Sequence, residues 1–195
     1  MKIESLKDLL YENLRDLYDA EKLLVKALPK IAKAVNSEEL REAVQSHLQQ
    51  TETHVNRLEQ VFEHLGEPAK SKPCQGMRGL LEEGKTVMEE DAPENLLDLA
   101  IIAAAQKVEH YEISAYGTAR EMAEQIGAEE VVTLLEETLQ EEKETDERLT
   151  EIARTLLGET PGESEEVEEE EDTERKRQPA ATTSGRGHSA QRRAS

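Results

Sequence analysis

Large aromatic residues are almost absent from the sequence. Its 195 residues include no tryptophan, one phenylalanine and four tyrosines. Any core must therefore be built from Leu, Val, Ile and Ala, and such a core suits packed helices better than a β-sandwich. A chain of this length can hold one domain of about 150 residues together with an extension.

Cysteine, net positive charge and long apolar runs are lacking as well. The single cysteine, Cys74, excludes an intramolecular disulfide and is typical of a reducing compartment. A formal charge of −20 argues against nucleic-acid binding by the folded domain, because phosphates would be repelled, and it is compatible with cation binding. No apolar run reaches transmembrane length, and the acidic start MKIESLKDLLYE differs from a signal peptide. We therefore expect a cytoplasmic protein with no membrane partner.

Capping residues, glycines and apolar periodicity predict an all-α domain with long helices. We expect them at about 5–35, 36–65, 93–126 and 129–157. The first two are joined by a very short turn, as are the last two, so each pair should form an antiparallel hairpin. The link between the hairpins is long enough to cross the bundle, which is the layout of ferritin-like four-helix bundles.

Two segments depart from regular helix. Pro29 lies inside the first predicted helix, so we expect a bend near Leu28. The link at 66–92 contains Pro68, Pro73, Gly76 and Gly79 and then a short amphipathic piece, LLEEGKTVMEED.

The C-terminal segment has a different composition. It is acidic in GESEEVEEEEDTE and basic after that, with Val167 as its only large aliphatic residue. Such a segment cannot bury enough apolar area to offset the entropy of ordering. We therefore divide the chain into a bundle at 1–158 and a disordered tail at 159–195. The basic end of the tail could bind anionic partners or fold back on the acidic run.

The inward seam of each predicted helix, followed in alternating steps of three and four residues, is apolar at both ends and polar in the middle. The interruptions that we take as candidate metal ligands are Glu21, His54, Glu109, Glu112, Glu142 and Asp146. Counted from the two hairpin turns, each lies about 15 to 18 residues away. Because a helix rises about 1.5 Å per residue, all of them fall within roughly one helical turn of a single level.

A buried layer of five carboxylates and one histidine would be strongly repulsive without compensation. The seams carry no Lys or Arg, so the alternatives are protonation, a water-filled channel or a multivalent cation. Two divalent ions bridged by glutamates and completed by histidine resolve the repulsion directly. Ligands rich in carboxylate, with imidazole, suit iron or manganese better than zinc or copper.

Several of these residues have plainer interpretations when they are taken singly. Each glutamate alone is better explained as a solvated flank, and His54 alone as a core histidine. His47, two turns from His54, is interpreted as packing or as a residue outside the ligand shell. Tyr116 could be core filler or an electron relay. His64 and His110 lie off the seams, where we expect them to be exposed.

Five segments of the sequence, in order, resemble the YciE/YciF family of ferritin-like proteins. They are DLYDAEKLLVKALPKIAKA, QTETHVNRLEQVFEHLGE, KPCQGMRGLLEEG, KVEHYEISAYGTA and EEKETDERLTEIA. The resemblance covers about residues 5–157. It implies a di-metal four-helix bundle, a homodimer, an association with bacterial stress responses and ferroxidase activity.

The ferritin-like superfamily has Glu on its first and third helices and Glu-x-x-His on its second and fourth. Glu21 and Glu109 match the single glutamates, and Glu112 and Asp146 lie near enough to supply missing ligands. In the second motif His54 matches, but Thr51 stands in place of the glutamate. In the fourth motif Glu142 matches, but Thr145 stands in place of the histidine.

The predicted function is oxidation of Fe(II) by O2 or H2O2 at a site that holds two iron ions, with Glu109 or Glu142 as the bridge. A manganese, catalase-like centre is the nearest chemical alternative. The alternative of another class is a non-enzymatic, dimeric stress or structural protein. In that case the polar layer holds water or adventitious metal, and the tail binds partners.

Overall fold

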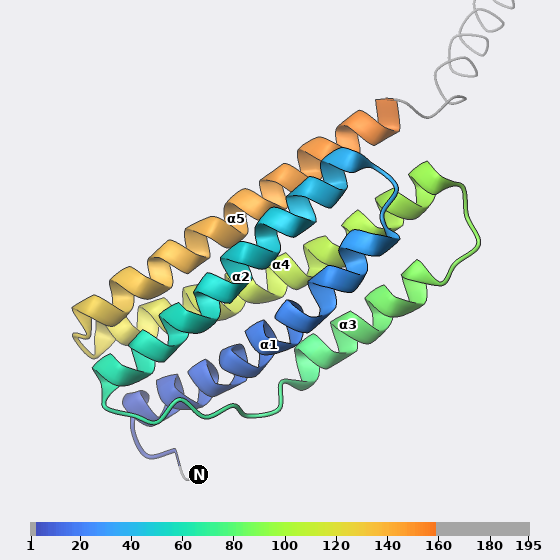
Figure 1. Cartoon of the computed structure of the whole chain (residues 1–195). Coiled ribbons are helices and arrows are strands. Elements are labelled where there is room, and N and C mark those ends of the chain that lie inside the picture. The colour runs from blue at the N-terminus through green and yellow to red at the C-terminus, as the bar shows by residue number, and fades with distance from the viewer. Residues whose placement is uncertain (1–2, 159–195) are drawn as a thin grey trace, which may run out of the picture. The chain divides into compact units, whose positions relative to one another are not determined.

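The computed structural model describes residues 3–158, and every regular element among them is a helix. The elements are α1 (Leu6–Ala34), α2 (Glu38–Leu65), α3 (Gln75–Met88), α4 (Glu94–Gln125) and α5 (Glu129–Gly158), as Figure 1 shows. The all-α prediction is confirmed, and the long helices lie where the sequence predicts them. The tail predicted to be disordered, at 159–195, lies outside the described residues.

The ends of the long helices follow from local chemistry. Ser5 and Asp8 form a capping box, in which the Asp8 N–H donates to Ser5 Oγ at 3.1 Å and the Ser5 N–H donates to Asp8 Oδ2 at 2.9 Å. Gly66 closes α2 with a φ of +70°, a left-handed conformation that glycine adopts without a Cβ clash. α1 continues through Pro29, and the bend near Leu28 stays a prediction.

The four long helices form a bundle of two antiparallel hairpins (Figure 1). α1 pairs with α2 and α4 pairs with α5, while α2 contacts α5 and α1 contacts α4. The link between the hairpins runs along the bundle, and its helix α3 packs on α1 and α4. Among residues 3–158, no helix combines the length and apolar character needed to cross a membrane.

Helix α3 begins five residues before the amphipathic piece expected from the sequence. Cys74 caps it, because its Sγ accepts a hydrogen bond from the Met77 N–H at 3.3 Å, and the Met77 side chain is fully buried. Gly76 lies in the first turn of the helix, where a Cβ would come within 3.0 Å of a ring carbon of Tyr111, so glycine suits the close packing there. Close packing on α4 thus overrides the weak helix propensity of glycine.

The core consists of two apolar clusters that lie on either side of a polar layer. On α1 the boundary is sharp, since Leu17 belongs to one cluster, Leu24 to the other, and the buried Glu21 lies between them. The first cluster also contains Leu14, Leu58, Val61 and Leu135. The second contains Leu28, Leu40, Ile102 and Ile152. The fold therefore surrounds its polar layer with apolar side chains along the bundle axis.

Candidate metal site

The bundle brings five of the six predicted ligands together, with one further histidine. Their ligand atoms form two overlapping groups, and within each group all the atoms lie within 4.8 Å of one another. One group contains Glu21, His54 and Glu142, and the other contains His47, Glu109, Glu112 and Glu142. Glu142 belongs to both groups, so α5 supplies the carboxylate that connects them.

These side chains are almost completely removed from solvent. Glu21, His54, Glu112 and Glu142 have no exposed surface, and Glu109 is 3% exposed. Within the described part of the chain, eight buried side-chain atoms of the cluster have no hydrogen-bond partner. They are Glu21 Oε2, His47 Nε2, His54 Nδ1, Glu109 Oε2 and both carboxylate oxygens of Glu112 and Glu142. Buried polar atoms are nearly always paired, so this concentration marks a place built for a ligand.

Burial favours the protonated, uncharged form of three of the glutamates. It raises the pKa of Glu21, and it raises the pKa of Glu109 and Glu112 well above the ordinary value. For Glu109 and Glu112 the negative charge of Glu142 raises the pKa further. These carboxyl groups therefore ionise readily only when a cation lies close to them.

His54 carries the cluster's own positive charge. Its Nδ1 lies 2.9 Å from Glu142 Oε1 and 3.6 Å from Glu21 Oε1. Burial lowers the pKa of His54, but the carboxylates of Glu142 and Glu21 outweigh burial and raise that pKa to about 10. Burial likewise acts to raise the pKa of Glu142, yet the interactions with His54 and His47 leave it lowered. Without a metal, one imidazolium thus faces several buried carboxyl groups.

The outer nitrogen of His54 is held by residues that the sequence analysis did not single out. His54 Nε2 donates to Glu141 Oε2 at 2.7 Å. Arg57 donates to the same Glu141 oxygen at 2.7 Å and to Thr138 Oγ1 at 2.7 Å. This arrangement aims Nδ1 into the cluster, as carboxylates do for metal-binding histidines. Glu141 stands beside Glu142 in a run of glutamates, so its role carries no distinct signal in the sequence.

His47 lies in the cluster, whereas the sequence analysis interpreted it as packing or as a residue outside the ligand shell. Its Nε2 lies 3.6 Å from Glu109 Oε1 and 4.0 Å from Glu142 Oε2. Its Nδ1 lies 3.3 Å from the Thr145 hydroxyl oxygen. Burial lowers the pKa of His47, which favours the neutral imidazole that binds metals. The position of His47 on the same seam as His54 was the signal that could have placed it here.

Asp146 does not belong to either group of ligand atoms. Its side chain is 20% exposed, and its Oδ1 accepts a hydrogen bond from Gln106 Nε2 at 3.0 Å. His110 Nε2 lies 3.5 Å from the same oxygen, with the His110 side chain 68% exposed. Asp146 thus faces the edge of α4, while its role as a ligand stays a prediction. His110 and His64 are exposed, as expected.

Tyr116 lies at the border between the cluster and the first apolar cluster. It is fully buried, and its hydroxyl donates a short hydrogen bond to Glu21 Oε1. Burial raises the pKa of Tyr116 well above its ordinary value, with the Glu21 carboxylate as the next cause. Tyr116 therefore stays protonated and positions Glu21, in addition to filling the core.

Comparison with known proteins places this geometry in a family. The model of the family described as "Domain of unknown function (DUF892)" matches residues 5–160. Protein YciF of Escherichia coli strain K12 is 44% identical over 154 residues, which are 78% of this chain and 93% of that protein.

Solved structures agree with the sequence matches. The crystal structure of the E. coli stress protein YciF matches with a TM-score of 0.79 and 42% identity, covering 81% of this chain and 100% of that one. YcfI from Rhodopseudomonas palustris matches with a TM-score of 0.75 and 40% identity, over 76% and 95% of the two chains. A ferritin-like, diiron-carboxylate protein from Bacillus anthracis has a TM-score of 0.60 at 18% identity, over 77% and 99%. This last match shows the shared fold alone.

Proposed function

The chain belongs to the DUF892 family, which confirms the resemblance to YciE/YciF proteins, and from this premise we propose that it binds two iron ions in the buried cluster and oxidises Fe(II). The relative from E. coli is described as a stress protein. A ferritin-like fold with a buried His/Glu cluster suits that role, because removal of Fe(II) limits its reactions with oxidants.

The concentration of unpaired buried atoms carries this proposal. A stable protein core rarely leaves eight polar atoms of one cluster without hydrogen bonds. Protonation of a carboxyl group lets it donate to a neighbouring carboxylate, but each proton supplies a single donor. Divalent cations satisfy these oxygens and the two imidazoles together, and this mixed set of carboxylate and imidazole donors suits iron or manganese.

The residues of the cluster can be assigned as ligands to two metal positions. Glu21 and His54 would hold one ion, His47, Glu109 and Glu112 would hold the other, and Glu142 would connect them. When bound, iron supplies one-electron redox chemistry, for which O2 or H2O2 is the oxidant. The carboxylates favour the Fe(III) product, because harder and more highly charged ions prefer oxygen ligands. Glu141 fixes the ring of His54, and the apolar clusters exclude bulk water.

The direct test is metal analysis followed by an oxidation assay. Protein purified without chelators or a histidine tag is assayed for bound metals, depleted, and then loaded anaerobically with Fe(II). We expect about two ions per chain, and oxidation after exposure to O2 or H2O2 that is faster than in a protein-free Fe(II) solution. If the protein binds Fe(II) but does not accelerate its oxidation, the proposed ferroxidase activity is wrong and only the proposed metal binding stands.

The same preparation separates the alternatives. Manganese as the main bound ion, with dismutation of H2O2, favours the catalase-like centre. Absence of stoichiometric binding of either metal favours the stress or structural protein without enzymatic activity. The relative from R. palustris is described as "a putative structural protein". We also propose that the protein is a homodimer and that it is cytoplasmic. Light scattering tests the homodimer, and fractionation of cells tests the location.

A further inference from the structure

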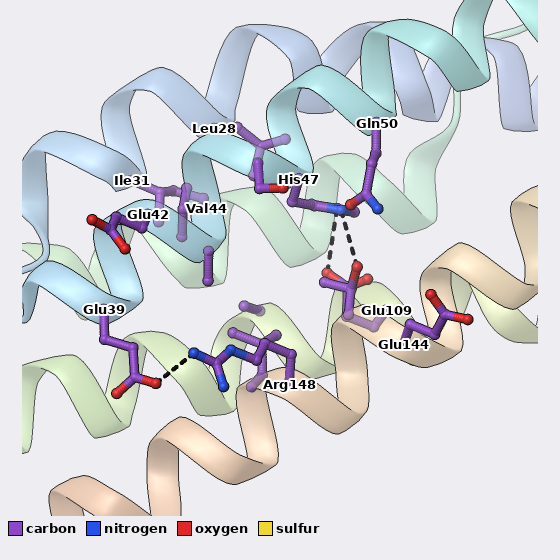
Figure 2. A pocket seen from close by; sticks show the side chains of 15 residues that line it. Leu28, Ile31, Glu39, Glu42, Val44, His47, Gln50, Glu109, Glu144 and Arg148 are labelled. Atoms are coloured by element: carbon purple, nitrogen blue, oxygen red, sulfur yellow. Dashed lines mark hydrogen bonds and ion pairs between the residues drawn. The ribbon is translucent and has the colours of Figure 1, made fainter.

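A cavity of about 330 Å³ connects the outside of the bundle with the cluster (Figure 2). It opens between α2 and α5, and its deeper walls come from α1 and α4. Its lining residues differ in character between the inner end, the mouth and the sides. They are His47 and Glu109 at the inner end, Glu39, Glu42, Glu144 and Arg148 at the mouth, and apolar side chains such as Leu28 and Val44 along the sides.

The inner end of the cavity belongs to the cluster itself. His47 and Glu109 line it, and each has a buried atom without a hydrogen-bond partner, His47 Nε2 and Glu109 Oε2. Figure 2 shows these two side chains facing each other at the end of the cavity. An ion that moves inward therefore meets unpaired donors of the group formed by His47, Glu109, Glu112 and Glu142.

The mouth has an excess of negative charge. Three glutamates line it, and Arg148 is the single basic side chain among the lining residues. Arg148 is already paired with Glu39 on α2 and with Glu151 at 3.2 Å on its own helix. Glu42 and Glu144 are exposed, so they present their charge to solvent. A recess lined by one sign of charge raises the local concentration of the opposite ion.

The sides of the cavity are poor ligands for an ion. Leu28, Ile31, Val44 and Leu149 offer no donor atoms, and the polar lining residues Ser46, Gln50 and Thr145 offer only uncharged ones. A cation is therefore attracted at the mouth, held at the inner end and bound only weakly between them. A cation can pass through such a cavity only if the mouth attracts it strongly enough for it to enter and the walls bind it too weakly to hold it on the way. The ligand atoms in this cavity are distributed in that way, with carboxylates at the mouth, weak or no ligands along the sides, and His47 and Glu109 at the inner end.

We propose that this cavity is the route by which divalent cations reach the cluster, and that the Arg148–Glu39 ion pair across its mouth slows their passage. The inference rests on the proposed metal site. It concerns the rate at which cations are taken up and not the number of cations that the chain binds at equilibrium. Arg148 joins α5 to α2 at the mouth, as Figure 2 shows, and its positive charge opposes an approaching cation.

Stopped-flow uptake of Co(II) by the metal-free full chain, in the absence of oxygen, tests the route. Co(II) reports binding through its visible absorption and needs no oxidation step. The double variant Glu42→Gln/Glu144→Gln should lower the uptake rate constant by about threefold or more at low salt, and the difference should shrink at high salt. Arg148→Gln should raise the rate constant, and Ala43→Trp, which fills the cavity, should lower it at every salt concentration.

The matched control is Glu63→Gln/Glu130→Gln, which removes two exposed charges that do not line the cavity. Its rate should equal that of the unaltered protein, and the equilibrium number of Co(II) ions should be the same in every variant. Unchanged rates in the Glu42→Gln/Glu144→Gln and Ala43→Trp proteins, with normal Co(II) capacity, would overturn the route and leave the metal site intact. Absence of Co(II) binding in the unaltered protein would overturn the metal site and the route together.

Discussion

The apolar clusters and the polar layer occupy the same four helices, yet they act on stability in opposite directions. On α1, Leu17 and Leu24 are 1% exposed and the intervening Glu21 is not exposed at all. Complete burial of a leucine stabilises the fold by about 1.5–3 kcal/mol. Burial of an unpaired carboxylate is unfavourable by several kcal/mol even after relaxation. The apolar clusters therefore maintain the bundle, while the polar layer lowers the stability of the bundle until a cation compensates the buried charge.

Truncation of an apolar side chain should have the largest effect. Leu14→Ala removes a fully buried side chain of the first cluster, so we expect it to lower the free energy of unfolding by about 2–5 kcal/mol. The loss should be similar with and without metal, because Leu14 supplies no ligand. Urea unfolding measures it, and Leu157→Ala, at a leucine that is 60% exposed, is the control that should change little. A loss confined to the metal-bound form would contradict the separation of the two regions.

Replacement of a buried acid by an apolar residue should act with the opposite sign. Both oxygens of Glu112 lack hydrogen-bond partners among the described residues. Glu112→Leu should therefore stabilise the metal-free protein by about 1–4 kcal/mol, since the unfavourable burial of a carboxyl group is removed. The same variant should lose metal-dependent stabilisation. Glu63→Leu, at an exposed position, is the control, and a destabilised metal-free Glu112→Leu protein would refute the comparison.

A change outside the cluster should affect metal affinity and leave the fold almost unaltered. Glu141→Gln weakens the hold on His54 Nε2, so we expect metal affinity to fall by about 10–100-fold. Isothermal titration with Co(II) or Mn(II) measures the change. Glu137→Gln is the matched control, because Glu137 also pairs with Arg57, at 3.3 Å, whereas the ion pairs of His54 within residues 3–158 are with Glu21, Glu141 and Glu142. If the Glu141→Gln and Glu137→Gln proteins bind the metal with equal affinity, Glu141 does not position His54 for metal binding.

The last prediction concerns the pH dependence of the metal-free protein. The pKa of Glu109 and of Glu112 is raised above the ordinary 4.5, so the folded state holds protons that the unfolded state has lost. Their contribution is complete below pH 4.5 and is lost as pH rises through the raised values. The pKa of His54, raised from 6.5 to about 10, acts in the same direction between those values. Glu142, whose pKa is lowered, acts in the opposite direction.

Stability of the metal-free protein should therefore decline from pH 5 toward pH 8, by at most about 1.4 kcal/mol per pH unit for each titrating group. Urea unfolding at several pH values measures the slope. Saturating metal should reverse it, because metal binding displaces protons from the carboxyl groups. Glu112→Gln should flatten the slope of the metal-free protein. A metal-free protein that gains stability over this range would show that the acids are already ionised and solvated.

The level of the cluster could be predicted because helical rise is a property of the backbone. Glu21, Glu109 and Glu142 occur at similar distances from the hairpin turns, and the structure places them in one layer. The membership of the cluster was harder to predict. His47 lies two turns from His54, yet the two rings have their centroids 6.5 Å apart, because both side chains lean toward Glu142.

The start of α3 escaped prediction, and the contacts of Asp146 were not foreseen. Two glycines early in α3 oppose helix formation locally, but the Cys74 cap and the buried Met77 favour a helix there, and the Tyr111 ring leaves no room for a Cβ at Gly76. Asp146 has the spacing of a seam residue, but Gln106 and His110 hold it at the edge of the bundle. Both differences arise from partners that are distant in the sequence.

The two hairpins and the height of the polar layer follow from local properties, namely apolar periodicity, caps and a constant rise per residue, and five segments of the sequence carry the resemblance to the family. That His47 joins Glu142, that Glu141 holds His54, and that a cavity with an acidic mouth ends at His47 and Glu109 became visible in the folded structure alone. The reason is that the direction of a side chain around its helix depends on the neighbouring helices. Those neighbours are set by packing, which no single segment contains.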